Sequence, residues 1–303
     1  MLLLTMMFTG EPVTGFTPYR RWLPPAEFLQ GAAVDASRPL DLARMRRQFN
    51  INTINAYGVS AANVEPLQEA AAAQGMRVVV RLEEYDPATF AFRPEDASAL
   101  VARYAAVLGR LRPEVVAYVV VNMPVDDPRV HGRERQAAYA ADAVSLVRRK
   151  APGVPVFLSL FYGWDGSYDV PSYAESGADG YALTSYSYPR NRVATAASTT
   201  DELIDTKRLH RAADRATAAH PGRPLVVEYG FQTVQFQRGG GRPDQTAGLV
   251  ADEPAKKKAM RATTAFYRNN YPAVIGTMYF GYDIVKQEGD PPRPVDFGLT
   301  PPA

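Results

Sequence analysis

The sequence lacks the residues that build disulfides, thiolate metal sites and membrane spans. It contains no cysteine and only three histidines among its 303 residues. Without cysteine, disulfides, thiolate metal ligands and a cysteine nucleophile are excluded. No two histidines have the spacing of metal ligands, so we expect neither a metal site nor a cofactor. No apolar run approaches the roughly 20 residues that span a bilayer, so we expect no membrane-spanning segment.

The charge of the chain is nearly balanced. Its 34 Lys and Arg residues against 32 Asp and Glu residues give a formal net charge of +2. The basic residues are scattered rather than arranged in stripes with aromatic residues, so nucleic acid is not a predicted partner. The absence of cysteine is compatible with a cytoplasmic location.

The apolar start of the chain, Met1 to Phe8, lacks a basic segment and a small-residue cleavage site. We interpret it as an edge strand or tail, with a trimmed export signal as the alternative.

Strand and helix patterns alternate along the chain after a proline-rich entry. Short apolar runs typical of strands buried on both faces recur eight times, and amphipathic segments separate them. The predicted strands are 27–35, 51–57, 76–82, 115–121, 154–160, 180–186, 224–228 and 273–280. Eight such units favour an α/β fold with a closed (β/α)8 barrel, also called a TIM barrel. We predict an N-terminal extension over residues 1–26 and a single barrel domain over residues 27–303.

Polar and aromatic residues follow most of the predicted strands. In a barrel these positions share one face, because the carboxyl ends of parallel strands meet there. Amides and carboxylates bind hydroxyl groups, and aromatic rings cover the apolar face of a pyranose, so this mixture is typical of sugar binding. The residues expected to bind substrate are Tyr57, Glu83, Glu84, Met123, Asp126, Tyr162, Trp164, Tyr188, Phe231, Tyr279 and Asp283.

Glu228 is the carboxylate that the sequence sets apart most clearly. The run Leu225-Val226-Val227 ends abruptly in Glu228, which is followed by Tyr229 and Gly230. Burying a carboxylate without partners costs several kcal/mol, so the chain either pairs this group or uses it. A structural pairing with an arginine such as Arg81 is one interpretation, and a functional role at the strand end is the other. Of the adjacent Glu83 and Glu84, only one can point inward along a strand.

In layout and at a few motifs the chain resembles the clan A glycoside hydrolases, the retaining (β/α)8 glycosidases. Glu228-Tyr229-Gly230 is similar to the strand that carries the nucleophile in that clan, and Asn122 and Pro124 flank its acid/base position. Tyr186 or Tyr188 is similar to the tyrosine that supports the nucleophile. The resemblance implies that Glu228 is the nucleophile, that Tyr186 orients it and that Asn122 contacts the substrate.

The resemblance breaks at the acid/base position, where Met123 stands in place of glutamate. A thioether can neither donate a proton to a leaving group nor deprotonate water.

Three hypotheses about function follow. The chain is a glycoside hydrolase-like enzyme acting on a glycoside or another polyhydroxylated small molecule, with its acid supplied from elsewhere or with little need for one. Alternatively, the barrel is repurposed for a biosynthetic cyclisation, lyase or dehydration step with Glu228 as base, or it is a carbohydrate-binding protein without catalysis. The sources considered for a replacement acid are Glu83, Glu84, Asp126, Asp127 and His131.

Overall fold

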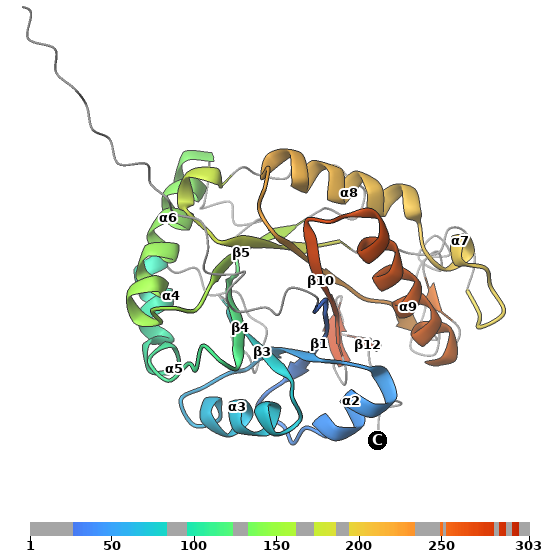
Figure 1. Ribbon diagram of the computed structural model, residues 1–303, viewed down its shortest axis with the longest axis horizontal. Helices are drawn as coiled ribbons and strands as arrows, with labels where there is room; N and C mark the ends of the chain where they lie inside the picture. The colour runs from blue at the N-terminus through green and yellow to red at the C-terminus, as the bar shows by residue number, and fades with distance from the viewer. Residues whose placement is uncertain are drawn as a thin grey trace, which may run out of the picture.

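Eight parallel strands close into a barrel in the computed structural model, which confirms the predicted (β/α)8 fold (Figure 1). The structure describes residues 27–83, 96–123, 133–161, 173–185, 194–233, 249–250, 253–281, 285–288 and 293–296. The barrel strands are β1 (Leu29–Asp35), β2 (Thr53–Tyr57), β3 (Arg77–Leu82), β4 (Val116–Val121), β5 (Val156–Phe161), β6 (Gly180–Thr184), β7 (Leu225–Tyr229) and β10 (Val274–Tyr279). The predicted extension over residues 1–26, including Met1 to Phe8, lies outside the described residues.

The strands follow one another around the barrel in chain order, and β10 closes it by pairing with β1. Helices surround the strands on the outside (Figure 1). They are α2 (Leu42–Phe49), α3 (Val64–Ala73), α4 (Ala97–Arg103), α5 (Ala105–Leu108), α6 (Arg133–Lys150), the 3-10 turn η1 (Ala174–Ser176), α7 (Thr200–Leu203), α8 (Thr206–Ala219) and α9 (Glu253–Asn270). Two small sheets lie outside the barrel: β8 (Gln232–Thr233) pairs with β9 (Leu249–Val250), and β11 (Val285–Glu288) with β12 (Arg293–Asp296).

Capping residues determine where the helices begin and end. The Asp41 side chain accepts a hydrogen bond from the Arg44 backbone N–H at 2.8 Å and starts α2. The helix ends at Asn50, whose backbone is left-handed (φ 53°), as is usual at a helix C-terminus. Thr199 and Glu202 form a capping box, but it caps only the four-residue α7. The chain is extended at Ile204, and Asp205 caps a separate helix, α8.

The core has two layers, because successive side chains of a strand point to opposite faces. Inside the barrel, Val79, Tyr118, Phe157, Val226 and Met278 belong to one buried cluster. The larger cluster lies between the strands and the helices.

Two glycines make room inside the barrel for large neighbours. A Cβ atom added at Gly180 would lie 2.5 Å from the Phe157 ring, and one added at Gly31 would overlap the Met278 sulfur. Any larger residue at these positions therefore displaces an interior side chain.

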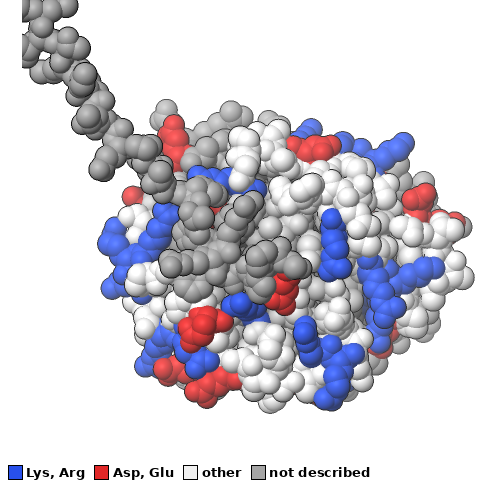
Figure 2. All heavy atoms as spheres, viewed as in Figure 1, with Lys and Arg blue, Asp and Glu red and all other residues white. Residues whose placement is uncertain are grey.

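The surface mixes both signs of charge. On the face shown in Figure 2, Lys and Arg side chains are interspersed with Asp and Glu over the surrounding helices. Within the described residues, no helix combines the length and the apolar composition that crossing a membrane requires.

Candidate active site

Glu228 lies near the carboxyl end of β7 and faces the interior of the barrel. It is two residues after Val226, an interior side chain, so the alternation of the strand directs it inward. Only 6% of its surface is exposed. The predicted position of this carboxylate, at the end of a buried strand, is therefore what the structure has.

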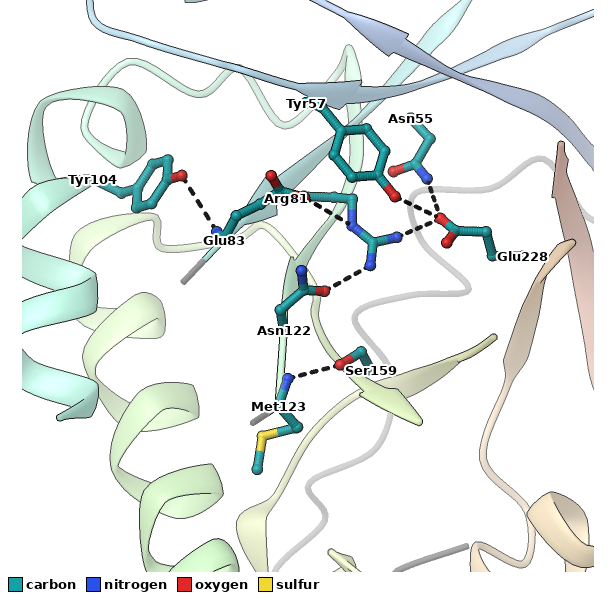
Figure 3. A network of polar contacts seen from close by, with 9 residues as sticks. All are labelled: Asn55, Tyr57, Arg81, Glu83, Tyr104, Asn122, Met123, Ser159 and Glu228. Atoms are coloured by element: carbon teal, nitrogen blue, oxygen red, sulfur yellow. Dashed lines mark hydrogen bonds and ion pairs between the residues drawn. The ribbon is translucent and has the colours of Figure 1, made fainter. Parts of the chain in front are cut away.

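One oxygen of the Glu228 carboxylate accepts three hydrogen bonds (Figure 3). The donors to Oε2 are Asn55 Nδ2 at 2.8 Å, the Tyr57 hydroxyl at 3.0 Å and Arg81 Nη1 at 2.6 Å. Within the described part of the chain, no donor contacts the other oxygen, Oε1. The two oxygens are therefore chemically distinct: Oε2 is held in place, and Oε1 is not engaged by these residues.

Arg81 is the centre of this network. Its side chain is 6% exposed, and its Nη2 donates to Asn122 Oδ1 at 2.6 Å. Its Nε lies 3.8 Å from Glu83 Oε1, which is an ion-pair contact but longer than a hydrogen bond. Burial acts to lower the pKa of Arg81. The neighbouring Glu228 carboxylate acts to raise it, and the net shift of the pKa is upward. Arg81 therefore stays cationic at every pH at which the protein is folded.

Tyr57 remains a hydrogen-bond donor for the same reason of burial. Desolvation raises the pKa of Tyr57 well above its ordinary value, Arg81 opposes the rise, and Glu228 adds to it. Its ring also lies under the Arg81 guanidinium at 4.9 Å and packs edge-on against Phe280 at 5.7 Å. Tyr57 was predicted to bind substrate, and the structure shows that its hydroxyl bonds Glu228.

Of the two adjacent glutamates, Glu83 points inward. Val79, Arg81 and Glu83 alternate along β3 and its extension, so they share the interior face. The backbone of Glu83 is held on both sides: its N–H donates to the Tyr104 hydroxyl at 3.3 Å, and its carbonyl accepts from Arg103 Nη2 at 2.7 Å.

Asn122 and Met123 follow β4 and point in different directions (Figure 3). Asn122 turns toward Arg81, as the 2.6 Å hydrogen bond shows. Met123 is 5% exposed and belongs to the cluster between barrel and helices, and its thioether points away from Glu228. The Met123 backbone N–H donates to Ser159 Oγ at 2.7 Å.

Two other predicted residues that the structure describes are not gathered at this network. Phe231 and Tyr279 are fully buried in the barrel–helix cluster, where the Tyr279 hydroxyl donates to the Phe231 carbonyl at 3.3 Å. The predicted residues outside the described part are Glu84, Asp126, Tyr162, Trp164, Tyr186, Tyr188 and Asp283.

Two residues of the network were not among the predicted catalytic and substrate-binding residues, although Arg81 is the arginine that one interpretation pairs with Glu228, and the structure confirms that pairing. Asn55 lies two residues before Tyr57 on β2, and Arg81 two residues before Glu83 on β3. In each case the period of two that places one residue inside the barrel also places the other there. This alternation is present in the sequence, but Arg81 stands within an apolar run, which makes its inward position hard to recognise.

The described residues include no group of three or more His, Asp and Glu side chains arranged to hold a metal ion. The chemistry that this arrangement offers is that of a held carboxylate beside a permanent cation and a neutral tyrosine.

A comparison with protein-family models gives no match, and neither does a comparison with curated proteins. Solved structures do match the fold. A GH2 β-galacturonidase from Eisenbergiella tayi bound to galacturonate gives a TM-score of 0.55 at 11% identity, covering 84% of this chain and 44% of that one. A β-glucuronidase 2 from Bacteroides uniformis, covalently bound to an aziridine of cyclophellitol-6-carboxylate, gives 0.56 at 14% identity, covering 90% and 33%.

A GH113 β-1,4-mannanase gives a TM-score of 0.54 at 10% identity and covers 84% of this chain and 88% of its own. The chain spans less than half of the length of the first two structures. At these identities the similarity establishes the fold: this chain has a barrel similar to those of glycoside hydrolases.

Proposed function

We propose that this chain is a glycoside hydrolase-like enzyme that acts on a glycoside or another polyhydroxylated small molecule, with Glu228 as nucleophile. The observation that carries the proposal is the asymmetry of the Glu228 carboxylate. Three donors orient its Oε2, and none of the described residues engages Oε1. A nucleophilic carboxylate requires this arrangement, because one oxygen must attack while the other is held.

The neighbours of the carboxylate hold it in place. Arg81 provides a buried positive charge at 2.6 Å, and Tyr57 provides a hydroxyl that does not ionise at working pH. Asn122, which is tied to the same guanidinium, supplies an amide that can bond a substrate hydroxyl.

Met123 does not replace the acid/base group of a retaining glycosidase. Its side chain cannot carry a proton and packs in the barrel–helix layer. We therefore expect the chain to cleave glycosides with good leaving groups more readily than simple alkyl glycosides.

The test is turnover of a panel of activated aryl glycosides by the wild type and by Glu228→Gln. Glutamine keeps the size of the side chain and can still accept the bonds from Asn55 and Tyr57, but it is not a nucleophile. We expect the wild type to release the phenol from at least one sugar, and Glu228→Gln to lower kcat/KM on the order of 10⁴-fold, as loss of a nucleophile does in other enzymes.

The matched control is Glu69→Gln, which makes the same change on the exposed face of α3. It should leave kcat/KM unchanged. No turnover by the wild type, or full activity in Glu228→Gln, would overturn the proposal and favour a binding protein or another chemistry.

A further inference from the structure

A second carboxyl group lies beside Glu228, and it comes from β3 rather than from β4. Leu82 pairs with Val121 in the parallel register, and the Asn122 backbone N–H donates to the Leu82 carbonyl at 3.2 Å. Glu83 therefore follows β3 directly alongside Asn122. Neighbouring strands are about 4.8 Å apart, a shift that a glutamate side chain can span.

Arg81 contacts the carboxyl groups of both Glu83 and Glu228 (Figure 3). Glu228 Oε2 contacts Nη1 at 2.6 Å, and Glu83 Oε1 lies 3.8 Å from Nε of the same guanidinium. Because both carboxyl groups contact the same guanidinium, their contacting oxygens lie at most about 9 Å apart. This range includes the separation of about 5 to 5.5 Å that retaining glycosidases have.

The environments of the two carboxyl groups differ in the way that an acid and a nucleophile require. Glu228 accepts a short hydrogen bond from Arg81, whereas Glu83 is 1.2 Å further from the same cation. Burial of Glu83, which is 6% exposed, and the nearby Glu228 act against a second negative charge, whereas the Arg81 contact at 3.8 Å acts in its favour. Carboxyl pairs whose surroundings differ in this way divide the roles of acid and base.

Hydrogen bonds fix the backbone of Glu83, and burial and the contact with Arg81 restrict its side chain. Tyr104 accepts from its N–H and Arg103 donates to its carbonyl, and both come from the region of α4. A proton donor needs such positioning, because proton transfer requires hydrogen-bond reach to the leaving oxygen.

We infer that Glu83 supplies the proton that Met123 cannot; this inference rests on the proposed function of Glu228. As the glycosidic C–O bond breaks, the leaving oxygen takes the proton of the Glu83 carboxyl group and departs as a neutral alcohol. An electron pair of Glu228 Oε1 forms the bond to the anomeric carbon. In the second step, the Glu83 carboxylate takes a proton from the water that displaces Glu228, which restores both groups.

The test compares Glu83→Gln, Glu228→Gln and the wild type on aryl glycosides of one sugar, with leaving groups from dinitrophenol to phenol. A dinitrophenolate group departs without protonation, whereas a phenolate group needs a proton from an acid in order to depart. We expect Glu83→Gln to lower kcat/KM for the phenyl glycoside by about 10²- to 10³-fold and for the dinitrophenyl glycoside by less than about tenfold. It should also remove the alkaline limb of the pH profile, whereas Glu228→Gln should abolish cleavage of both substrates.

The outcomes separate the two proposals. If Glu228→Gln is inactive but Glu83→Gln affects all leaving groups equally, or none, the role of Glu83 is wrong and the proposed function stands. If the wild type cleaves nothing, or Glu228→Gln is active, the proposed function itself fails. Glu83→Gln leaves the Arg81–Glu228 pair in place, so the variant should still unfold in one cooperative urea transition. Glu83→Asp, which keeps the acid on a shorter side chain, should retain more activity on the phenyl glycoside than Glu83→Gln.

Discussion

Arg81 and Glu228 form a buried ion pair, and its energetic value depends on both partners being present. Breaking such a pair by removing one charge costs about 3 to 5 kcal/mol, because the other charge stays buried without a partner. Replacing both charges costs less for the same reason. Substituting either residue alone should therefore lower stability more than substituting both residues together.

We predict that Arg81→Met lowers the free energy of unfolding by about 3 to 5 kcal/mol. In the Glu228→Gln background the same change should cost at least about 2 kcal/mol less, because neutral glutamine leaves no unpaired charge at position 228 and still accepts from Asn55 and Tyr57. Urea unfolding of the wild type, the two single variants and the double variant measures this coupling.

The exposed pair of Arg110 and Glu65, 3.4 Å apart, is the control for this cycle. Its coupling should stay below about 1 kcal/mol, because solvent screens exposed charges. Strictly additive effects at Arg81 and Glu228 would show that the buried pair is not a coupled unit.

At the scale of the element, β5 and β6 show how a small residue allows a barrel interior to be filled. The Phe157 ring on β5 occupies the space that a side chain at Gly180 on β6 would need. On its other face, Phe157 stacks on the Tyr118 ring at 4.2 Å with an interplanar angle of 17°. The phenyl ring therefore has little room to move away from an added methyl group.

We predict that Gly180→Ala lowers the free energy of unfolding by about 1 to 3 kcal/mol through overpacking. Combining it with Phe157→Leu should cost less than the sum of the two single changes, since the smaller side chain relieves the clash. Gly109→Ala is the matched control: its added Cβ would meet its nearest atom, the Ala105 carbonyl oxygen, at 3.4 Å and should change stability by less than about 0.5 kcal/mol. Equal losses in both alanine variants would contradict the packing argument.

The strands and the barrel were predictable from the sequence, and the breaks in the helices were not. A strand buried on both faces must be apolar throughout, so runs such as Val78-Val79-Val80 show their structure directly. The helical segment between β3 and β4 is divided at Tyr104 into α4 and α5, and the segment between β6 and β7 is divided at Ile204 into α7 and α8. Both breaks occur at residues that a helix readily accommodates, so tertiary packing rather than local preference sets them.

The position of Glu228 was likewise predictable, and one interpretation of the sequence named its pairing with Arg81, which the structure shows. Its hydrogen bonds with Asn55 and Tyr57 were not predicted. Alternation along a strand shows that Asn55 and Arg81 face inward, yet it cannot show which inward residues meet across the barrel. That depends on the closure and stagger of the eight strands, which no local pattern encodes.

At the scale of the whole molecule, buried tyrosines make stability depend on alkaline pH. Burial is the largest cause that raises the pKa of Tyr57, Tyr118, Tyr229 and Tyr267. In the unfolded chain these hydroxyls ionise near pH 10. Between that pH and the higher folded pKa, the unfolded state has lost protons that the folded state keeps, so stability falls as pH rises.

We predict that the free energy of unfolding declines above about pH 10, and that Tyr118→Phe makes the decline shallower by up to about 1.4 kcal/mol per pH unit, the effect of one proton. Phenylalanine keeps the stacking with Phe157 and removes only the ionising group. Urea unfolding at steps from pH 8 to pH 11.5 measures both slopes. Identical slopes for the variant and the wild type would mean that the Tyr118 hydroxyl ionises equally in both states.

The ion pair of Arg81 and Glu228 has a consequence for how the barrel is assembled. The two residues are 147 positions apart in the chain, and β3 and β7 lie opposite each other in the ring of strands. All the described partners of the Glu228 carboxylate come from β2 and β3, in the first half of the barrel, whereas Glu228 comes from the second. Neither half of the barrel alone contains the site. The ion pair of Arg81 and Glu228 therefore forms only when the two halves have come together.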